Sequence, residues 1–550
     1  MEQTFELIAK TFQGLEEVLA QELIELGADD VQIGRRMVSF SGNQEMMYRA
    51  NFCLRTAVRI LKPIKHFKAK DANGVYAAVK SIDWSQYLDI DTSFVVDTTV
   101  YSTEFRNSKF VAYKVKDAIV DYFMETQQKR PNISISNPDL RLNMHISEDT
   151  CTLSLDSSGE SLHQRGYREA TVEAPINEVL AAALIKMSGW KFDCDFVDPF
   201  CGSGTLLVEA ALMARNIFPG VFRKKFGFEN WKDFNPELFR SIFDDDSQER
   251  EFNHKIYGYD LNLRAVEAAQ ANAKAAGVAD IVTIEQREIA AFVKPENPAI
   301  MVTNPPYGER LRPEDLSQIY RTIGEKLKKE FQGNDAWLIS SKEELFDAMR
   351  LRPSFKVMLQ NGALDCELRK YVTFEGRLDK FRGEGGVVKT DEELSRMGEK
   401  GRFRDGRKRE FSRKRGDFGD EREDREKRGE RRERHSNGRD DRRRFYDADE
   451  RPRFEPDFAD DPEMAAAYRN LRARHNTFER VRNAKERSER GEERPRRFER
   501  DGDRKFGSRD KRRSFGDRGD RNFGDRDRKF GKRDRNDRGD RGNFRRRNDD

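Results

Sequence analysis

Two short segments, about a hundred residues apart, combine residue types that suit a binding turn and a reactive loop. The first is Asp198-Pro199-Phe200-Cys201-Gly202-Ser203-Gly204-Thr205 and the second is Asn304-Pro305-Pro306-Tyr307-Gly308-Glu309-Arg310. Glycines in the first segment let the backbone pass close to a ligand, and a helix starting at Thr205 would offer free N–H groups there. The turn lacks the Gly-Lys-Ser/Thr of a P-loop and the spacing of a dinucleotide G-x-G-x-x-G, although dinucleotide binding stays an alternative.

The second segment follows an apolar run and is stiffened by two prolines. These would fix the Asn304 amide oxygen and the Pro305 carbonyl oxygen as paired acceptors for an exocyclic NH₂ group. Tyr307 offers a flat face on which a base can stack. Accepting both hydrogen bonds draws the amine lone pair toward an electrophilic methyl group, which is work of positioning and electrostatics without a metal. Together the two segments indicate a methyl donor and a planar amine acceptor.

Acidic residues follow two further strands. Asp260 ends the run Tyr257-Gly258-Tyr259-Asp260, where a carboxylate can accept hydrogen bonds from ribose hydroxyls. The alternative is that Asp260 caps the next helix, a role for which Asn262 is an equal candidate. Glu288, after the third strand, could contact an adenine amine. These strand ends predict a pocket for an adenosyl ligand.

The elements that must position these residues alternate from about residue 174 onward. Alternating strands and helices predict a doubly wound α/β sheet with parallel strands. An apolar helix is expected to open at Ala174-Pro175-Ile176 and to run to about Met187. The expected strands are 196–198, 256–259, 282–285, 299–303 and 335–340, and the expected helices are 204–215, 263–276, 315–331 and 342–350. Residues 216–253 interrupt the alternation and are interpreted as an insertion that shapes the ligand face.

Two smaller α+β modules are expected in front of this sheet. The first sixty residues or so alternate as strand–helix–strand–strand–helix–strand, which predicts a ferredoxin-like unit. In the second module, Asn107-Ser108-Lys109 opens a helix whose N-terminus could hold a phosphate, although Asn and Ser are also ordinary helix caps. His145 lies in an alternating strand, where an ordinary sheet-face histidine is the expectation.

The net charge of the chain changes sign near residue 380. Residues 1–380 hold 48 Lys/Arg and 57 Asp/Glu, a net charge of −9, whereas 381–550 hold 56 and 43, a net charge of +13. The second segment has no apolar periodicity, so it is predicted to be a disordered tail that contacts a polyanion or serves solubility alone. Five scattered cysteines without a CxxC pair argue against a disulfide framework or zinc knuckle, and neither a signal peptide nor an apolar run of membrane length is found, so a cytoplasmic protein is expected.

The residues of the sheet domain resemble class I methyltransferases that use S-adenosylmethionine, in the amino-methylating branch with an (N/D)PP(Y/F/W) loop. The resemblance implies that residues 198–205 bind the donor, that Asp260 accepts its ribose and that residues 304–307 form the catalytic loop. It also assigns Ala174-Pro175-Ile176-Asn177-Glu178 to a helix that covers the donor. The third-strand position, usually Asp in this branch, falls on Glu288.

Two features narrow the resemblance. NPPY alone is shared with DNA adenine and protein glutamine methyltransferases, whereas NPPYGER is typical of RNA guanine-N2 methyltransferases. Residues 68–157, with the linker His163-Gln164-Arg165-Gly166-Tyr167-Arg168, resemble a THUMP module behind its usual ferredoxin-like partner, and THUMP modules bind RNA. The resemblance covers roughly residues 1–378 and points to the bacterial 23S rRNA guanine-N2 methyltransferases.

The sequence therefore predicts an enzyme that methylates guanine N2 in RNA, with 23S rRNA as the expected substrate and the base extruded toward Tyr307. tRNA guanine-N2 or adenine-N6 methylation stays open, as does an RNA-binding ribosome-assembly factor or RNA chaperone; protein partners, oligomeric state and the modified position stay open too. The expected domains are a ferredoxin-like module (1–67), a THUMP domain (68–157), a linker (158–173), a Rossmann-like methyltransferase domain (174–380) and the tail (381–550). The expected catalytic residues are Asn304, Pro305, Pro306 and Tyr307; the donor-binding residues are Asp198, Phe200, Gly202, Gly204, Thr205, Asp260, Glu288 and Asn304; and the RNA-binding residues are Asn107, Lys109 and Arg310.

Overall fold

A computed structural model describes residues 3–172, 175–308, 312–376, 378–383 and 387–389. The chain divides into two compact units, 1–490 and 491–550, and the second lies wholly outside the described residues. The predicted disordered tail lies outside them as well, apart from its first residues. Helix α11 (Leu378–Gly383) lies across the predicted start of the tail at residue 381.

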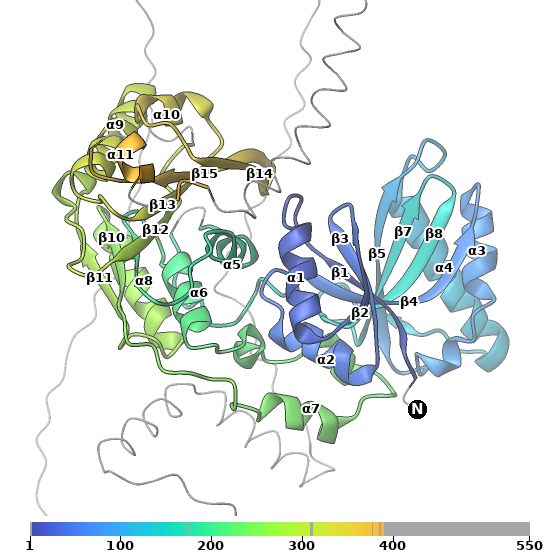
Figure 1. Cartoon of the computed structure of the whole chain (residues 1–550). Helices are drawn as coiled ribbons and strands as arrows, with labels where there is room; N and C mark the ends of the chain where they lie inside the picture. The colour runs from blue at the N-terminus through green and yellow to red at the C-terminus, as the bar shows by residue number, and fades with distance from the viewer. Residues whose placement is uncertain (1–2, 173–174, 309–311, 377, 384–386, 390–550) are drawn as a thin grey trace, which may run out of the picture. The chain divides into compact units, whose positions relative to one another are not determined.

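Residues 5–156, the front half of the described chain, form one continuous eight-stranded sheet in the order β2-β3-β1-β4-β8-β7-β5-β6 (Figure 1). The expected ferredoxin-like and THUMP modules are thus joined through β4 and β8, which pair antiparallel along most of their length. The strands are β1 (Phe5–Lys10), β2 (Asp29–Gly34), β3 (Met37–Gly42), β4 (Arg59–Lys68), β5 (Ser93–Tyr101), β6 (Asn132–Ile133), β7 (Leu140–Ser147) and β8 (Thr150–Asp156). The helices are α1 (Glu16–Leu26), α2 (Gln44–Cys53), α3 (Ala72–Lys80) and α4 (Ser108–Gln127).

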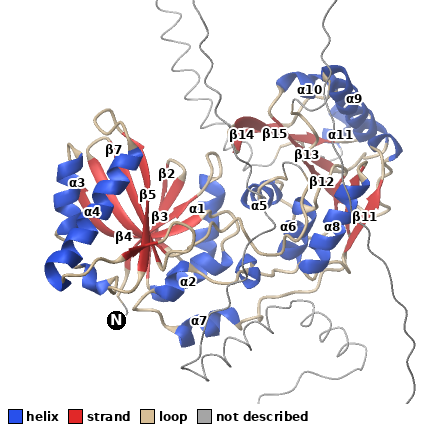
Figure 2. Cartoon of the chain, turned by 180° about the vertical axis from the view of Figure 1, so that it is seen from behind, coloured by secondary structure: helices blue, strands red, loops and turns tan. Residues whose placement is uncertain are grey.

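The second half forms a seven-stranded mixed sheet in the order β11-β10-β9-β12-β13-β15-β14. Its strands are β9 (Asp195–Asp198), β10 (Ile256–Asp260), β11 (Val282–Gln286), β12 (Ala299–Thr303), β13 (Asp335–Ser340), β14 (Phe355–Asn361) and β15 (Leu364–Val372). The main helices are α5 (Glu178–Met187), α6 (Thr205–Ala214), α8 (Leu263–Ala275), α9 (Pro313–Lys329) and α10 (Glu343–Ala348). Helices α5, α6 and α8 lie on one face of the sheet and α9 and α10 on the other (Figure 2).

The predicted doubly wound fold is confirmed in its central part. Strands β11, β10, β9, β12 and β13 pair in parallel. All five residues of β12 and all four of β9 are buried, as expected for parallel strands that are covered on both faces. The carboxyl ends of β9, β10 and β12 therefore meet at one edge of the sheet, where the two chemical segments begin.

One prediction in this half was wrong, and one element was not predicted. The helix expected from Ala174 begins only at Glu178, because Asn177 is its N-cap and accepts a hydrogen bond from the backbone N–H of Val179. The antiparallel hairpin of β14 and β15 was not predicted, and it makes the sheet mixed rather than parallel throughout. Glu367, Arg369 and Lys370 on β15 interrupt its apolar pattern, which explains why periodicity alone did not reveal it.

The insertion 216–253 carries the short helix α7 (Pro236–Phe243) and packs on the front half of the chain. Phe228 stacks on Tyr48 of α2 at a ring-centroid distance of 4.3 Å, and the hydroxyl of Tyr48 accepts a hydrogen bond from the backbone N–H of Asn235. Phe239 of α7 packs against Phe52 on the same helix. Aromatic contacts thus hold the insertion, which extends from the second sheet, against helix α2 of the front half. No helix in the described part of the chain is long and apolar enough to cross a membrane.

Candidate active site

The glycine turn between β9 and α6 leads into a helix that begins at Thr205, as expected. Gly202 and Gly204 have φ angles of 52° and 79°, which favour glycine. A Cβ atom on Gly204 would lie 2.9 Å from the Cβ of Ala269 on α8, so glycine lets the start of α6 pack against that helix. A Cβ atom on Gly202 would meet nothing closer than 4.0 Å, so one side of the turn is open to a ligand.

Hydrogen bonds join the three strand ends. The hydroxyl of Thr303, the last residue of β12, donates to Asp198 Oδ1 at 2.6 Å. The backbone N–H of Gly202 donates to Asp260 Oδ2 at 3.0 Å. Asn262 caps α8 by accepting from the backbone N–H of Arg264, so Asp260 is not the helix cap. The structure therefore brings Asp198, the glycine turn, Asp260 and the start of the Asn304 loop together.

Asp198 is almost fully buried at the centre of this group. Burial raises its pKa to about 7, and the charge of nearby Asp260 acts in the same direction, whereas hydrogen bonds from Thr303 and the Phe200 backbone oppose the shift. A carboxyl with this pKa changes its charge in the physiological range. The turn is thus sensitive to whatever neutralises or solvates Asp198.

Asn304 carries the most informative unpaired atom of the site. Its Oδ1 is buried and accepts no hydrogen bond from any described residue. Buried polar atoms without a partner are uncommon, and each of them needs an explanation, of which a role in binding or catalysis is one. Asn304 therefore presents a desolvated acceptor directly after β12, next to the glycine turn.

Tyr307 is 8% exposed, and its hydroxyl accepts a hydrogen bond from Asn361 Nδ2 at 2.7 Å. Burial raises the pKa of Tyr307, so the phenol stays neutral. Asn361 lies at the tip of the β14–β15 hairpin, which therefore holds the end of the tyrosine ring. Sequence reasoning missed this residue together with its hairpin.

A second missed residue, Arg168, lies behind the glycine turn. Its guanidinium donates to Glu178 Oε1 at 2.6 and 2.8 Å, to the Ser203 hydroxyl at 3.0 Å and to the Thr205 hydroxyl at 2.8 Å. One side chain from the linker thus ties the start of α5 to the start of α6. The signal in the sequence was an arginine that closes the linker motif, but nothing there showed its partners.

None of the remaining candidates forms a side-chain hydrogen bond with this group among the described residues. Glu288 is exposed and precedes a short 3-10 helix without capping it. Asn107 caps α4 by accepting from the backbone N–H of Phe110, as the structural alternative predicted, and Lys109 is exposed beside it. Arg310 lies outside the described residues.

Comparison with known proteins identifies all three expected parts of the chain. A profile of the RlmL ferredoxin-like domain matches residues 6–61, one of the THUMP domain matches 69–156, and one of the RMKL-like methyltransferase domain matches 165–370. A crystal structure named "SMU.472, a putative methyltransferase complexed with SAH" is 30% identical, with a TM-score of 0.62, and the match covers 68% of this chain and 100% of that one. The chain belongs to the THUMP-containing, RMKL-like methyltransferase family.

Two further relatives are matched over the same share of this chain but over different shares of their own length. A structure named "a predicted N6-adenine-specific DNA methylase from Listeria monocytogenes" is 31% identical, with a TM-score of 0.60, and the match covers 68% of this chain and 97% of that one. The "Ribosomal RNA large subunit methyltransferase K/L" of Photobacterium profundum is 39% identical over 385 residues, 68% of this chain and 54% of that protein. The chain thus spans about half the length of the curated relatives it matches. The predicted family and fold class are confirmed; the exact domain boundaries and the roles of individual residues stay predictions.

Proposed function

We propose that this protein transfers a methyl group from S-adenosylmethionine to the exocyclic N2 of a guanine in RNA, and that the RNA is 23S rRNA. The observation that carries the proposal is the buried, unpartnered Oδ1 of Asn304 at the end of β12. An amino group is the donor that such an oxygen lacks, and the glycine turn beside it is the place for a methyl donor. The likeness to a protein named ribosomal RNA large subunit methyltransferase supports the RNA class.

The residues around the turn fit S-adenosylmethionine. The open side of Gly202 leaves room for a ligand close to the backbone. Both carboxylate oxygens of Asp260 are held by backbone N–H groups, of Gly202 and Asn262, and each keeps a further lone pair for a ribose hydroxyl. The 30% identical methyltransferase was solved with SAH, the demethylated product of this donor. When bound, S-adenosylmethionine would supply an electrophilic methyl group.

The chain's own residues position the acceptor. Asn304 Oδ1 and the Pro305 carbonyl accept hydrogen bonds from the guanine amino group, which turns its lone pair toward the donor side of the loop. The two prolines keep these oxygens in place, so little reorganisation is needed during the reaction. The hydroxyl of Tyr307 is held by Asn361, and the tyrosine ring provides the surface against which the extruded base lies.

Nucleoside analysis tests the proposal. Full-length protein and S-adenosylmethionine are incubated with 23S rRNA from cells that lack the protein, and digested nucleosides are examined by mass spectrometry. N2-methylguanosine is the expected product. Asn304→Ala is expected to lower the rate about 100-fold or more, as for other lost preorganised hydrogen bonds. Gln318→Ala, an exposed amide on α9, is the matched control and should leave the rate unchanged.

The other outcomes separate the alternatives. N6-methyladenosine would replace the guanine assignment, in keeping with the relative named as an adenine-specific methylase. A product in tRNA but not in rRNA would change the RNA class. Calorimetry that finds no binding of S-adenosylmethionine, or binding that survives Asp260→Ala, would overturn the donor site. RNA binding without any methylated product would favour an assembly factor or chaperone.

A further inference from the structure

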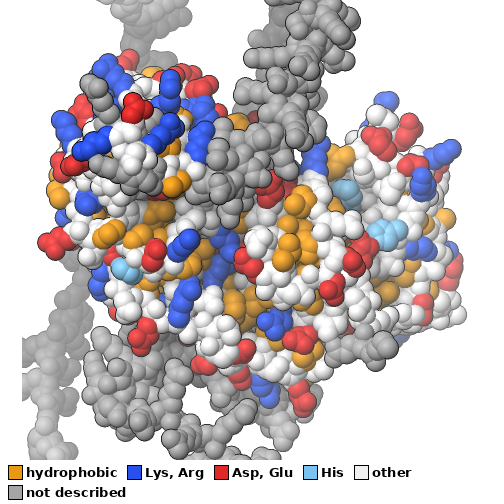
Figure 3. Space-filling view, in the orientation of Figure 1, with side chains coloured by type: hydrophobic (Ala, Val, Ile, Leu, Met, Phe, Trp, Pro, Cys, Tyr) orange, Lys and Arg blue, Asp and Glu red, His pale blue; other side chains and the backbone are white. Residues whose placement is uncertain are grey.

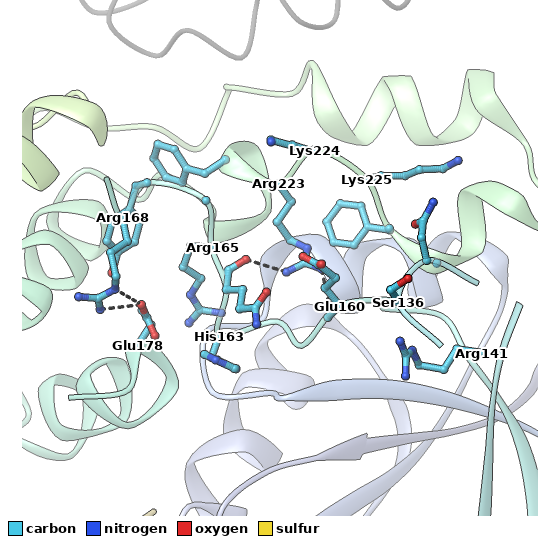
Figure 4. A pocket seen from close by; sticks show the side chains of 18 of the residues that line it. Ser136, Arg141, Glu160, His163, Arg165, Arg168, Glu178, Arg223, Lys224 and Lys225 are labelled. Atoms are coloured by element: carbon cyan, nitrogen blue, oxygen red, sulfur yellow. Dashed lines mark hydrogen bonds and ion pairs between the residues drawn. The ribbon is translucent and has the colours of Figure 1, made fainter. Parts of the chain in front are cut away.

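A cavity of about 850 Å³ lies beside the glycine turn rather than in it. It is bounded by the linker, by the start of the insertion 216–253, by the first residues of α5 and by the loop that leads into β7 (Figure 4). Its volume falls in the range of about 300–1,000 Å³ that is usual for ligand sites. Its lining includes residues 175–178, which the resemblance assigned to a helix that covers the donor, but neither Asn304 nor Asp260 lines it.

Basic side chains dominate the lining. The cavity has six cationic residues, Arg141, Arg165, Arg168, Arg223, Lys224 and Lys225, and three acidic ones, Asp139, Glu160 and Glu178. Burial lowers the pKa of the lining residue His163, so it adds no positive charge at neutral pH. The body as a whole is acidic, and Figure 3 shows charges of both signs interspersed over the face it presents. Three of these cations are paired with carboxylates, Arg141 with Asp97, Arg165 with Glu209 and Arg168 with Glu178. Arg223, Lys224 and Lys225 are left without an ion pair among the described residues, and this local positive charge needs an explanation.

Two of the acidic groups already have partners. Glu178 is paired with Arg168 at 2.6 Å, and the Asp139 carboxylate accepts hydrogen bonds from the backbone N–H and the hydroxyl of Ser93, both at 2.7 Å. Lys224 and Lys225 are exposed and form no ion pair with a described residue. Figure 4 shows both lysines on the insertion side of the cavity and Arg141 on the opposite side. Unneutralised cations thus stand at the mouth.

Arg223 fixes the wall from which the lysines project. Its two terminal nitrogens donate to the backbone carbonyls of Ser158, Glu160, Ser161 and Gln164 at 2.8 to 3.3 Å. Gly166 has a φ of 113°, and a Cβ atom there would lie 2.2 Å from the Phe222 carbonyl oxygen, so linker and insertion are in direct contact. The cavity is therefore preformed, and a ligand would not have to assemble it.

The lining favours a phosphate chain over a free base. Two large rings of the wall, Tyr167 and Phe226, are 2% and 3% exposed and offer no open face for stacking, and the third, Phe222, is half-buried. The Nε–H groups of Arg141 and Arg223 are buried and find no acceptor among the described residues. Missing acceptors beside unpaired lysines are what an incoming row of phosphate oxygens would satisfy.

We infer that this cavity binds the phosphodiester backbone of the RNA substrate where it passes from the THUMP module to the catalytic sheet. The inference rests on the proposed function and adds a second contact region to it. Arg168 links the cavity to the glycine turn through Ser203 and Thr205. RNA bound in the cavity would therefore lie next to the glycine turn and the start of α6. Contacts to phosphate fix the register of the RNA without selecting its sequence.

The salt dependence of RNA binding tests the inference. The full-length protein is compared with the double variant Lys224→Ala/Lys225→Ala, with 23S rRNA as the probe. Each lost phosphate contact lowers the slope of log K against log salt by about 0.7 to 0.9, so a slope shallower by about 1.4 to 1.8 is expected. Lys224→Arg/Lys225→Arg should restore the wild-type slope. The control pair, Lys191→Ala/Lys274→Ala, removes two exposed lysines away from the cavity and should leave the slope unchanged.

Three results would overturn the inference. The first is an unchanged slope in the alanine variant, and the second is an equal change in the control pair. The third is a calorimetric result in which the wild type binds inorganic pyrophosphate and the alanine variant does not, while both bind rRNA equally well. That result would identify a small-anion site instead. Donor binding and N2-methylguanosine formation by the wild type are measured in parallel, so a failure of the proposed function is seen separately.

Discussion

The buried ion pair of Arg165 and Glu209 makes a prediction that can be worked out from the contacts. Arg165 belongs to the linker and Glu209 to α6; they are 2% and 0% exposed, and Arg165 Nε lies 3.4 Å from Glu209 Oε1. Arg165 also donates to the carbonyl oxygens of Leu162 and Arg55, so it ties the linker to the front sheet. In Arg165→Ala, Glu209 keeps one described hydrogen bond, from the Tyr167 hydroxyl at 3.0 Å.

Removing one partner of a buried pair costs about 3–5 kcal/mol when the other charge is left uncompensated. The charge of Arg55 still favours ionised Glu209 in Arg165→Ala, so a cost near the lower end of this range is expected. Burial already raises the pKa of Glu209, and Arg165 is the first of the groups that oppose the shift. Without Arg165 the folded-state pKa rises further above that of the unfolded chain. Stability is then fully present at low pH, where Glu209 is protonated in both states, and is lost as pH rises through the folded-state pKa. The cost of Arg165→Ala is therefore expected to be largest near pH 8 and distinctly smaller near pH 5.

Urea unfolding followed by tryptophan fluorescence measures this cost at both pH values. The double variant Arg165→Met/Glu209→Leu replaces the pair by apolar side chains of similar size, which is often neutral for stability. It should recover most of the stability lost in Arg165→Ala at pH 8. A cost that does not change with pH, or a double variant whose loss equals the sum of the two single losses, would refute this account of the pair.

Three further predictions concern the active site. Asn361→Ala releases the Tyr307 hydroxyl, so kcat for RNA methylation should fall about 10- to 100-fold while donor affinity measured by calorimetry stays unchanged; parallel losses would contradict the positioning role. Burial raises the pKa of Asp198 to about 7, so from pH 4 to pH 8 the unfolding free energy of the wild type should fall by about 4 kcal/mol relative to Asp198→Asn; parallel pH profiles would count against it. Gly204→Ala should weaken donor binding about 10-fold, because the added Cβ would meet α8. Gly333→Ala, with nearly the same φ of 80° but open space around the added Cβ, should not weaken it. Equal effects of the two substitutions would show that the close contact with α8 does not matter for donor binding.

The parts of the fold that could be predicted are those in which local pattern and tertiary environment agree. Strand β12 was predicted at its exact bounds, because a buried parallel strand is a continuous apolar run. Gly27 closes α1 in a left-handed conformation at a φ of 88°, as its position after the apolar stripe indicated. The β14–β15 hairpin escaped because it carries charges at positions that tertiary contacts satisfy: Arg369, 3% exposed, pairs with Glu367, and Lys370 pairs with Asp335.

The candidate site divides in the same way. Asp198, Gly202, Asp260 and Asn304 could be grouped from the sequence because parallel strands bring their carboxyl ends to one edge. Arg168 and the lysines at 224 and 225 could not, since their significance depends on which elements the linker and the insertion touch. The sequence showed a connector and an aromatic insertion, but the cavity exists only because Arg223 and Gly166 hold the two together.

The Tyr307 contact shows why order along the chain misleads about the reactive loop. The sequence predicts a tyrosine ring that stacks on a base, but it does not reveal that the hydroxyl of this ring is held by Asn361, 54 residues later. The same hairpin reaches the front half of the chain, where a Cβ atom on Gly14 would lie 2.6 Å from the Met358 carbonyl oxygen. A substitution at Gly14 would therefore push on β14, whose last residue is Asn361. The ferredoxin-like module, which holds none of the predicted catalytic residues, thereby supports the strand that positions the tyrosine.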